Sequence, residues 1–557
     1  MRPLMLFVAL AAAGALPTSL HAAAPAAQAD VARYATRMLA DNYNATGPGA
    51  AILVARGDEI LFRGARGLAD VKSGRALKAD DVFRIGSVSK QFAAAALLTL
   101  VESGKVVLAD PLSKYVPDYP NGEHITVLEL LNHTSGVKNY TSIPAVMEGP
   151  LEKDISTTQL IASFKNVAPD FAPGQDWAYD NSGYVLVGAV IEAASGMPWH
   201  EYERKTLFEP LGLIHTGYGA DPKAAALQVS GYGHEGAKLV PSRPISMTMP
   251  HAAGALLSTV DDLMKWNRAL HEGRVLKSAT YMQMITPVGK AIDAKYGFGI
   301  ENDSVRGQPV LGHSGGIFGF ASMLDYVPGP DISVVVLQNE EDNEGHDAPE
   351  VIARKLAAAA LGEPYPALVS IAVDAATLKQ IEGIYPVDGK SARVLRVVDG
   401  GLTAQRTGGP RSKLVPIGKD EFLYVDGLNR FTVARDATGA VAGMNFFADG
   451  EGPAVLVKRS AATLPADREE VPLRKAELDR VLGTYQADGR NLKVFLEGKH
   501  LMTQLVGQPA FEIFAESPSV FFLTVVDATL EFGAGKGPAP TVTLHQGGNN
   551  LPFARVR

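Results

Sequence analysis

Residues 83–104 read FRIGSVSKQFAAAALLTLVESG, and this stretch decides how the first part of the chain is interpreted. Its alanine- and leucine-rich centre predicts a helix, and Gly104 stands where a C-terminal cap is expected. Ser87 and Lys90 are three residues apart at the start of that helix, so their side chains lie on one face, one turn apart. A serine there meets backbone N–H groups that favour negative charge, and a neighbouring amine can accept its proton. The stretch is therefore a candidate for a nucleophilic serine beside a lysine base.

This spacing alone does not separate a nucleophile from an ordinary helix cap. The same pattern recurs from Ser135 to Lys138 in HTSGVKNYTS, where glycine and polar neighbours indicate a turn. A rival serine, Ser314, lies in GHSGG at 312–316, which matches the G-x-S-x-G elbow of the α/β-hydrolases. That elbow needs a helix directly after the serine, but IFGFASMLDYVPGPDISVVVLQ follows and alternates as a hairpin does. We therefore favour Ser87.

Strand patterns stand at both ends of this segment. GAAILVARGDEILFRGARG at 49–67 holds two apolar runs about the turn Gly57-Asp58. GFASMLDYVPGPDISVVVLQNE at 319–340 holds two more about a turn at 328–330. Helical patterns lie between them, so we expect one α/β unit whose terminal strands share a sheet.

Two further motifs follow along the chain, each beside a predicted element. YDN at 179–181 lies in a loop just before a helix, and HSG at 313–315 lies at the start of a strand. Taken singly, a tyrosine, an asparagine and a histidine in such places fit a buried aromatic, a helix cap and a satisfied strand residue. In this order after SVSK at 87–90, they resemble the serine β-lactamase and penicillin-binding-protein superfamily, whose signatures are S-x-x-K, S-x-N or Y-x-N, and K-T-G or H-x-G.

Four flanking stretches are also similar to the class C and peptidase branch of that superfamily. They read LADPLSKYVPDYP, ITVLELLNHTSGV, AAGALLSTVDDLMKW and YGFGI, and the resemblance covers nearly all of residues 29–361. It implies a β-lactamase/transpeptidase-like domain of the α/β (α+β) class, with an antiparallel sheet and a helical region.

The resemblance also implies a role for each motif residue. Ser87 attacks a carbonyl and forms an acyl-enzyme that water hydrolyses, while Lys90 and Tyr179 share the proton transfers, Tyr179 as a tyrosinate or as a tightly hydrogen-bonded phenol. Asn181 holds the amide of the substrate, and His313 lines the site and hydrogen-bonds toward Tyr179.

The last glycines of the third motif are assigned to substrate binding. Gly315 completes the H-x-G triplet, and the backbone N–H groups of Ser87 and Gly316 form the oxyanion hole. His313 stands where most β-lactamases have a lysine, and histidine there is the pattern of some D,D-peptidases and D-aminopeptidases. Efficient antibiotic hydrolysis is therefore not expected.

The function predicted from these motifs is an exported serine hydrolase, a peptidase or amidase that prefers a D-amino acid beside the scissile bond. An esterase or a weak β-lactamase on the same site remains the alternative, and a non-catalytic protein that binds peptidoglycan or a partner is the less favoured one. The substrate class is a small molecule or a peptide, peptidoglycan fragments included. We expect no metal, because no metal-ligand spacing such as H-E-x-x-H occurs, and no cofactor.

The amino-acid composition excludes several kinds of site and partner, and the first residues indicate where the protein is located. The 557 residues contain no cysteine, which removes thiolate catalysis, disulfides and thiolate metal sites. A formal charge of −8 over this length gives no reason to expect nucleic acid as a partner. The start, MRPLMLFVALAAAGALPTSLHAAA, has a basic residue, a short apolar run and small residues, as a secretory signal peptide does. We expect export to the periplasm or medium, with no transmembrane anchor in the mature form.

An internal repeat organises the rest of the chain. ATLKQIEGIYPVDG at 376–389 aligns with AELDRVLGTYQADG at 476–489, and further matches keep an offset near one hundred residues. Each copy has the strand spacing of a small antiparallel, lipocalin-like barrel. The predicted layout is a signal peptide at 1–23, a hydrolase domain at 24–365, and barrels at 366–465 and 466–557. This resembles the three-domain layout of D-aminopeptidases.

Overall fold

The computed structural model describes residues 28–556, apart from short stretches at 236–237, 342–345, 366–369, 390, 426, 465–467, 469, 488–489, 506–509 and 536. The predicted signal peptide lies outside the described residues, and so do the residues at the two predicted barrel boundaries, near 366 and 466. Within the described residues, none of the helices combines the length and apolarity that a membrane span needs.

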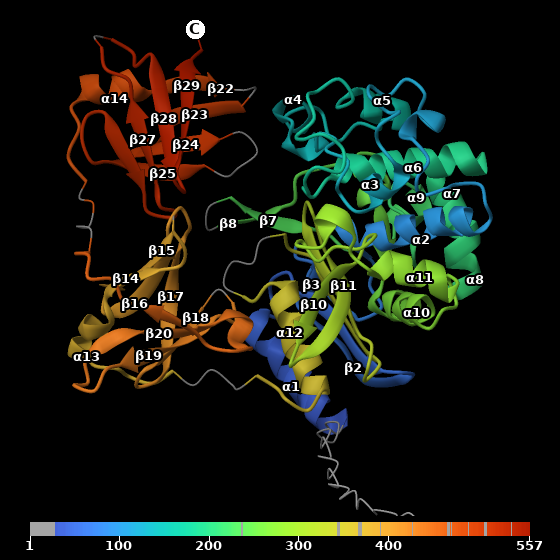
Figure 1. Ribbon diagram of the computed structural model, residues 1–557, viewed down its shortest axis with the longest axis horizontal. Helices are drawn as coiled ribbons and strands as arrows, with labels where there is room; N and C mark the ends of the chain where they lie inside the picture. The colour runs from blue at the N-terminus through green and yellow to red at the C-terminus, as the bar shows by residue number, and fades with distance from the viewer. Residues whose placement is uncertain are drawn as a thin grey trace, which may run out of the picture.

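A six-stranded antiparallel sheet forms the centre of the first domain (Figure 1). The first strand pairs with the last one along its whole length, with Ala50 opposite Gln338 and Arg56 opposite Ile332. The prediction that strands from both ends of the segment share a sheet is therefore confirmed, as are its two hairpin turns. In spatial order the strands are β10 (Glu301–Val305), β11 (Gln308–Ile317), β12 (Phe320–Val327), β13 (Ile332–Gln338), β1 (Ala50–Arg56) and β2 (Glu59–Arg66).

Helices cover both faces of this sheet, which explains why its central strands are buried at nearly every position and rich in apolar residues. In β1, Ile52 and Val54 pack with α1 (Gln28–Asn42) and α12 (Pro349–Ala360), whereas Leu53 faces the other core. That second core contains α2 (Ser89–Glu102), α6 (Asn181–Ser195) and α10 (Val260–His271), and it extends into the larger helical region seen beside the sheet in Figure 1.

Shorter elements complete the helical region. The helices are α3 (Val127–Leu131), α4 (Pro144–Met147), α5 (Thr157–Ala162), α7 (Trp199–Glu203), α8 (Glu209–Leu211), α9 (Pro222–Ala225) and α11 (Ser278–Ile285). The strands are β3 (Leu68–Asp70), β4 (Arg75–Ala76), β5 (Phe83–Arg84), β6 (Gly217–Tyr218), β7 (Tyr232–Glu235), β8 (Lys238–Pro241) and β9 (Leu256–Ser258).

Helix α2 lies in the middle of this region and is apolar around most of its circumference, as a buried helix must be. Phe92 stacks on Trp266 of α10 with ring centroids 3.9 Å apart, and Trp266 Nε1 donates to Gln91 Oε1 at 3.0 Å. The predicted cap is also present, because Gly104 adopts φ +73° two residues after the last residue of the helix. These contacts fix the helix whose first turn carries Lys90.

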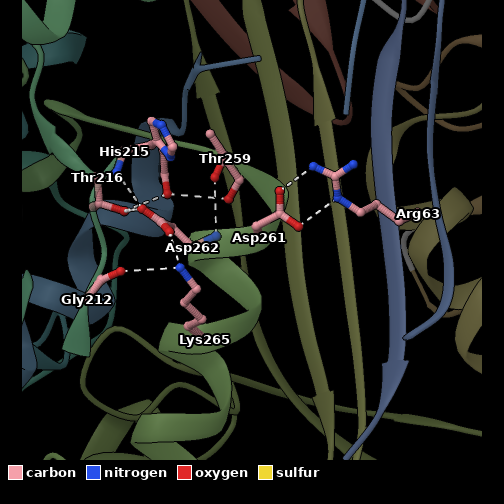
Figure 2. A network of polar contacts seen from close by, with 9 residues as sticks. Arg63, Gly212, His215, Thr216, Thr259, Asp261, Asp262 and Lys265 are labelled. Atoms are coloured by element: carbon pink, nitrogen blue, oxygen red, sulfur yellow. Dashed lines mark hydrogen bonds and ion pairs between the residues drawn. The ribbon is translucent and has the colours of Figure 1, made fainter. Parts of the chain in front are cut away.

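A buried carboxylate anchors the start of α10 (Figure 2). Asp262 is 1% exposed and accepts hydrogen bonds from His215 N at 2.7 Å and Lys265 Nζ at 3.0 Å. The neighbouring Asp261 points to the other side of the helix, where Arg63 of β2 binds it with two hydrogen bonds at 2.6 and 2.7 Å. Asp262 therefore joins α10 to the loop after α8, and Asp261 joins it to the sheet.

Replacing Asp262 by alanine is expected to lower the free energy of unfolding by about 1–3 kcal/mol, because it removes a buried carboxylate that accepts hydrogen bonds from His215 N and from the buried Thr216 hydroxyl. Urea denaturation of the purified protein measures this. Asp261→Ala is the matched control, and its half-exposed ion pair contributes about 1 kcal/mol or less. Equal losses for the two variants would show that burial does not distinguish them.

Two β domains follow the hydrolase domain, in line with the predicted fold class (Figure 1). The first is an eight-stranded antiparallel sheet curled so far that Ser460 N, just beyond its last strand, donates to Ile384 O of its first. It follows α13 (Ala375–Ile381) and consists of β14 (Gly383–Pro386), β15 (Ala392–Val398), β16 (Gly401–Arg406), β17 (Arg411–Gly418), β18 (Glu421–Tyr424), β19 (Arg430–Arg435), β20 (Val441–Phe447) and β21 (Val455–Lys458).

The second is a closed barrel of eight strands. It follows α14 (Lys475–Val481) and consists of β22 (Gly483–Ala487), β23 (Arg490–Glu497), β24 (His500–Leu505), β25 (Phe511–Ala515), β26 (Val520–Leu523), β27 (Ala528–Phe532), β28 (Thr541–Gln546) and β29 (Asn549–Arg555).

The residues shared by the two repeats make the same contacts in both domains. Tyr385 OH donates to Ile381 O at 2.6 Å, and Tyr485 OH donates to Val481 O at 2.8 Å, so each tyrosine ties the first strand to the preceding helix. The glycine two residues before each tyrosine leaves room for an arginine side chain near the end of the domain. The repeat is thus structural, as its sequence indicates.

Candidate active site

Ser87 lies in a single turn of 3₁₀-helix, Gly86–Val88, and α2 begins two residues later at Ser89. The sequence placed Ser87 in the helix itself, and the difference arises because the chain turns sharply at Gly86, which adopts φ +49°. A Cβ atom on Gly86 would lie 2.8 Å from the backbone nitrogen of Gly316 in β11. Only glycine lets the serine turn approach the strand this closely.

Lys90 stands one turn after Ser87 and is fully buried. Its Nζ donates to Ser87 Oγ at 3.0 Å, to Asn181 Oδ1 at 2.8 Å and to the Ala253 carbonyl at 2.9 Å. Three acceptors match the three protons of an ammonium, so the position of the amine is fixed. Sequence reasoning missed the Ala253 carbonyl, although AAGALLSTVDDLMKW, which contains it, was among the stretches similar to the family.

Burial destabilises the charged form of the Lys90 amine. Burial lowers the pKa of Lys90 to about 7, although Asp180 and Glu301 oppose this shift by attracting the charged form. An amine with this pKa is deprotonated in a large fraction of molecules near neutral pH. Lys90 can therefore accept the proton of Ser87 across the 3.0 Å hydrogen bond.

Tyr179 completes the group around the serine. Its hydroxyl hydrogen-bonds with Ser87, and Lys90 Nζ lies 4.7 Å from the centroid of its ring. Burial raises the pKa of Tyr179 well above its ordinary value, so the side chain is a phenol and not a tyrosinate. Of the two states that the sequence left open, the structure favours the hydrogen-bonded phenol.

His313 lies near these residues, but its partner differs from the predicted one. Its Nδ1 is 2.6 Å from Ser314 O, which only accepts, so Nδ1 carries the proton and Nε2 accepts from Tyr296 OH at 2.8 Å. The rings of His313 and Tyr179 are 6.1 Å apart, and Tyr296, the first residue of YGFGI, takes the hydrogen bond predicted for Tyr179. Burial lowers the pKa of His313 to about 3, so the ring is neutral.

His313 also lies inside β11, not at the start of a strand as expected. The side chain of Glu301 at the start of β10 reaches it, with a carboxylate oxygen 3.7 Å from His313 Nδ1, and it accepts a hydrogen bond from Ser314 N. No signal in the sequence marks this glutamate. It lies on the neighbouring strand because β10 and β11 form a hairpin.

The two glycines after Ser314 have different surroundings. A Cβ atom on Gly315 would lie 2.2 Å from Ile85 O, so Gly315 is required by the packing of β11 against the serine turn. A Cβ atom on Gly316 would meet nothing within 4 Å, so its backbone borders open space. That space is a pocket of 150 Å³. Among its lining residues are Ser87, Tyr140, Asn181, Gly316, Met147, Leu151, Ile245, Met249, Ile317 and Phe318.

The other S-x-x-K sequence forms no comparable site. Ser135 is buried, and its hydroxyl accepts a hydrogen bond from Val137 N two residues later. Lys138 Nζ pairs with Asp170 at 2.6 Å in a partly exposed place. In the described part of the chain, no three carboxylate or imidazole groups are arranged so that they could hold a metal ion.

A sequence profile of the family described as Beta-lactamase matches residues 33–359, which is more than half of the chain. The chain belongs to the Beta-lactamase family. Its fold and its relatives identify it as a serine hydrolase of the β-lactamase and penicillin-binding-protein superfamily, as the three motifs indicated.

Several proteins are similar to this Beta-lactamase family chain. Penicillin-binding protein 4* of Bacillus subtilis is 26% identical over 415 residues, which are 69% of this chain and 90% of that protein. D-aminopeptidase of Gluconobacter oxydans is 27% identical over 57% of this chain, and the match spans 60% of the D-aminopeptidase. The match therefore leaves about two fifths of that enzyme uncovered.

Solved structures agree with the fold. The octameric penicillin-binding protein homologue from Pyrococcus abyssi superimposes with a TM-score of 0.55 at 24% identity, over 77% of this chain and 99% of that one. D-amino acid amidase from Ochrobactrum anthropi, complexed with L-phenylalanine amide, superimposes with a TM-score of 0.50 at 25% identity, over 57% of this chain and 93% of that one.

Ser314→Ala is expected to leave kcat/KM within about three-fold of the wild-type value. Ser314 is not among the residues that line the pocket beside Ser87. Its contacts with the site are made by its backbone, which the substitution keeps. Steady-state kinetics on any ester or amide that the protein hydrolyses test this expectation. A loss of turnover would indicate that Ser314 of GHSGG is the nucleophile.

Proposed function

We propose that this serine hydrolase is an exported amidase or peptidase that works through an acyl-enzyme on Ser87 and prefers a D-amino acid beside the scissile bond. The observation that carries the proposal is the hydrogen bond of 3.0 Å between Ser87 Oγ and a buried Lys90 amine with a pKa of about 7. The D-amino acid preference is supported by the D-aminopeptidase and D-amino acid amidase among the similar proteins.

In the proposed acylation step, neutral Lys90 takes the proton of Ser87 as its oxygen attacks the substrate carbonyl. The developing oxyanion is held by the backbone N–H groups of Ser87 and Gly316, which border the pocket. Tyr179 relays a proton to the leaving amine, and water then hydrolyses the ester on Ser87 with Lys90 again as base.

Asn181 and the pocket walls position the substrate in this proposal. Asn181 Oδ1 is held by Lys90, while Asn181 borders the same pocket and can meet the substrate amide. The apolar residues Met147, Ile245 and Phe318 favour a substrate with an apolar side chain next to the scissile bond. His313 keeps the edge of β11 in place through Tyr296.

A substrate panel tests the proposal. Purified protein is assayed with matched D- and L-phenylalanine amides, a D-Ala-D-Ala peptide, a short-chain ester and a cephalosporin. The proposal expects the D-amide or the D-peptide to have the highest kcat/KM. A higher value for the ester or the cephalosporin supports an esterase or a β-lactamase on the same residues, and no turnover of any of them supports a binding protein.

Export is part of the proposal and rests on the first 23 residues. Expression of the full chain with a C-terminal epitope tag in a bacterial host, followed by cell fractionation and N-terminal sequencing, tests it. A shortened protein in the periplasm or medium is expected. A full-length protein in the cytoplasm would overturn this part alone.

A further inference from the structure

A second and larger cavity, of 350 Å³, lies on the face of the sheet opposite the pocket beside Ser87. Val310 and Gly312 of β11 line it, and in the alternation of a strand they face away from His313. Its other walls come from β10, β12 and α12, and from the turn between β18 and β19 of the first barrel. Its volume is in the range of small-molecule sites.

The walls combine apolar side chains with an excess of carboxylates. Apolar groups come from Val305, Val310, Met323, Val351, Ala357 and Leu428. The acidic residues are Glu301, Asp303, Asp325, Glu350 and Asp449, and the basic residue is Arg354.

Arg354 does not balance these charges. Its guanidinium binds Asp303 at 2.6 Å and also approaches Glu451 of the first barrel at 3.7 Å. Across the described stretches of the chain, no lysine or arginine lies within ion-pair distance of the other four acidic residues of the cavity.

Asp325 is the acidic residue of the cavity that has a buried oxygen atom available to a ligand. Its side chain is 4% exposed, and among the described residues its Oδ1 has no hydrogen-bond partner. The carboxyl lies over Gly312, where a Cβ atom would be 2.3 Å from Oδ1. A buried carboxylate without a partner is unfavourable, and a cation that binds next to it removes this cost.

We propose that this cavity binds an organic ammonium ion with an aliphatic chain, the ammonium against Asp325 and the chain against Val310, Met323 and Leu428. A metal ion fits less well, because the described residues offer no group of three ligands close enough to hold one. The mixed lining has the chemistry of an alkylamine: several carboxylates for its charge and apolar walls for its stem.

Binding of such a cation is expected to release protons near neutral pH. Burial raises the pKa of Asp325 to about 8 and that of Glu301 to about 7, and neighbouring acidic groups add to both shifts. Asp303 from β10, Glu350 and Arg354 from α12, and Asp449 from the first barrel also face the cavity. A cation beside Asp325 lowers these pKa values, so protons leave as it binds.

Isothermal titration of the full chain with pentylamine at about pH 7 tests the proposal. We expect saturable binding whose heat depends on the ionisation enthalpy of the buffer, as proton release requires. Pentanol, which has the same chain without the charge, is expected not to bind. Asp325→Asn is expected to weaken pentylamine binding at least about ten-fold, because it removes a charged hydrogen-bond acceptor.

Asp293→Asn is the matched control, because it removes the same charge from an exposed site outside the cavity. It is expected to bind as the wild type does. Glu350→Gln replaces Asp325→Asn if the latter does not fold. Unchanged affinity in the cavity variant, no saturable heat with pentylamine, or Mg²⁺ binding that requires Asp325 would overturn the proposal. None of these outcomes depends on turnover at Ser87.

Discussion

Ser87→Ala is expected to lower kcat/KM by at least about 10⁴-fold on the best substrate of the panel, because no other group takes the place of a nucleophile that forms the covalent intermediate. The protein should stay folded, since the substitution removes one oxygen from the edge of a pocket. The same assay with Ser314→Ala supplies the control, because Ser87 matches the S-x-x-K motif and Ser314 matches the G-x-S-x-G motif.

Covalent labelling gives an independent measurement of the same point. A fluorophosphonate is expected to add to Ser87, and mass spectrometry of the digested protein identifies the modified peptide. The Ser87→Ala protein is expected to take up no label. A label on Ser314, or full turnover by Ser87→Ala, is incompatible with the proposed acyl-enzyme.

Lys90→Met is expected to lower kcat/KM by about 10²- to 10⁴-fold, because it removes the general base and keeps the length and burial of the side chain. Lys138→Met is the matched control from the second S-x-x-K sequence. Its lysine forms a partly exposed ion pair away from the pocket, and the variant should keep wild-type activity.

The wild-type pH profile reports the same group. Below its pKa of about 7, Lys90 is an ammonium and cannot accept a proton, so kcat/KM is expected to fall as the pH drops below 7. Above that pH the amine is neutral and the rate levels off. Tyr179→Phe should lower the rate but keep this acidic limb, because burial keeps Tyr179 protonated throughout this range. If kcat/KM of Tyr179→Phe no longer fell below pH 7, the tyrosine and not Lys90 would be the base.

Local features of the site were predictable because they depend on residues that are close in the sequence. Ser87 and Lys90 are one turn apart, and their hydrogen bond follows from that spacing. The hairpin of β12 and β13 after Gly316 excluded an elbow at Ser314 for the same reason, since two adjacent strands with a short turn are visible in the pattern. The repeat was visible because its two copies keep the same residues at the same spacing.

Contacts between distant segments were not predictable in this way. The Ala253 carbonyl that holds Lys90 is a backbone atom, which any residue type supplies, so no letter of the sequence marks it. The hydrogen bond of His313 with Tyr296 instead of Tyr179 depends on how two distant segments pack, which no local pattern in the sequence shows. The acidic cavity is formed where the first barrel meets α12, so it exists only after the domains assemble.

The sequence by itself thus determined the family, the order of the motifs and the pairing of Ser87 with Lys90, since these depend on residue type and on short spacing. The tertiary structure decided the protonation state and the hydrogen-bond partners of each group. Burial makes Lys90 a base near neutral pH, keeps Tyr179 a phenol and leaves Asp325 Oδ1 without a hydrogen-bond partner among the described residues. Burial depends on which distant segments cover a side chain, and for this reason only the folded chain defines it.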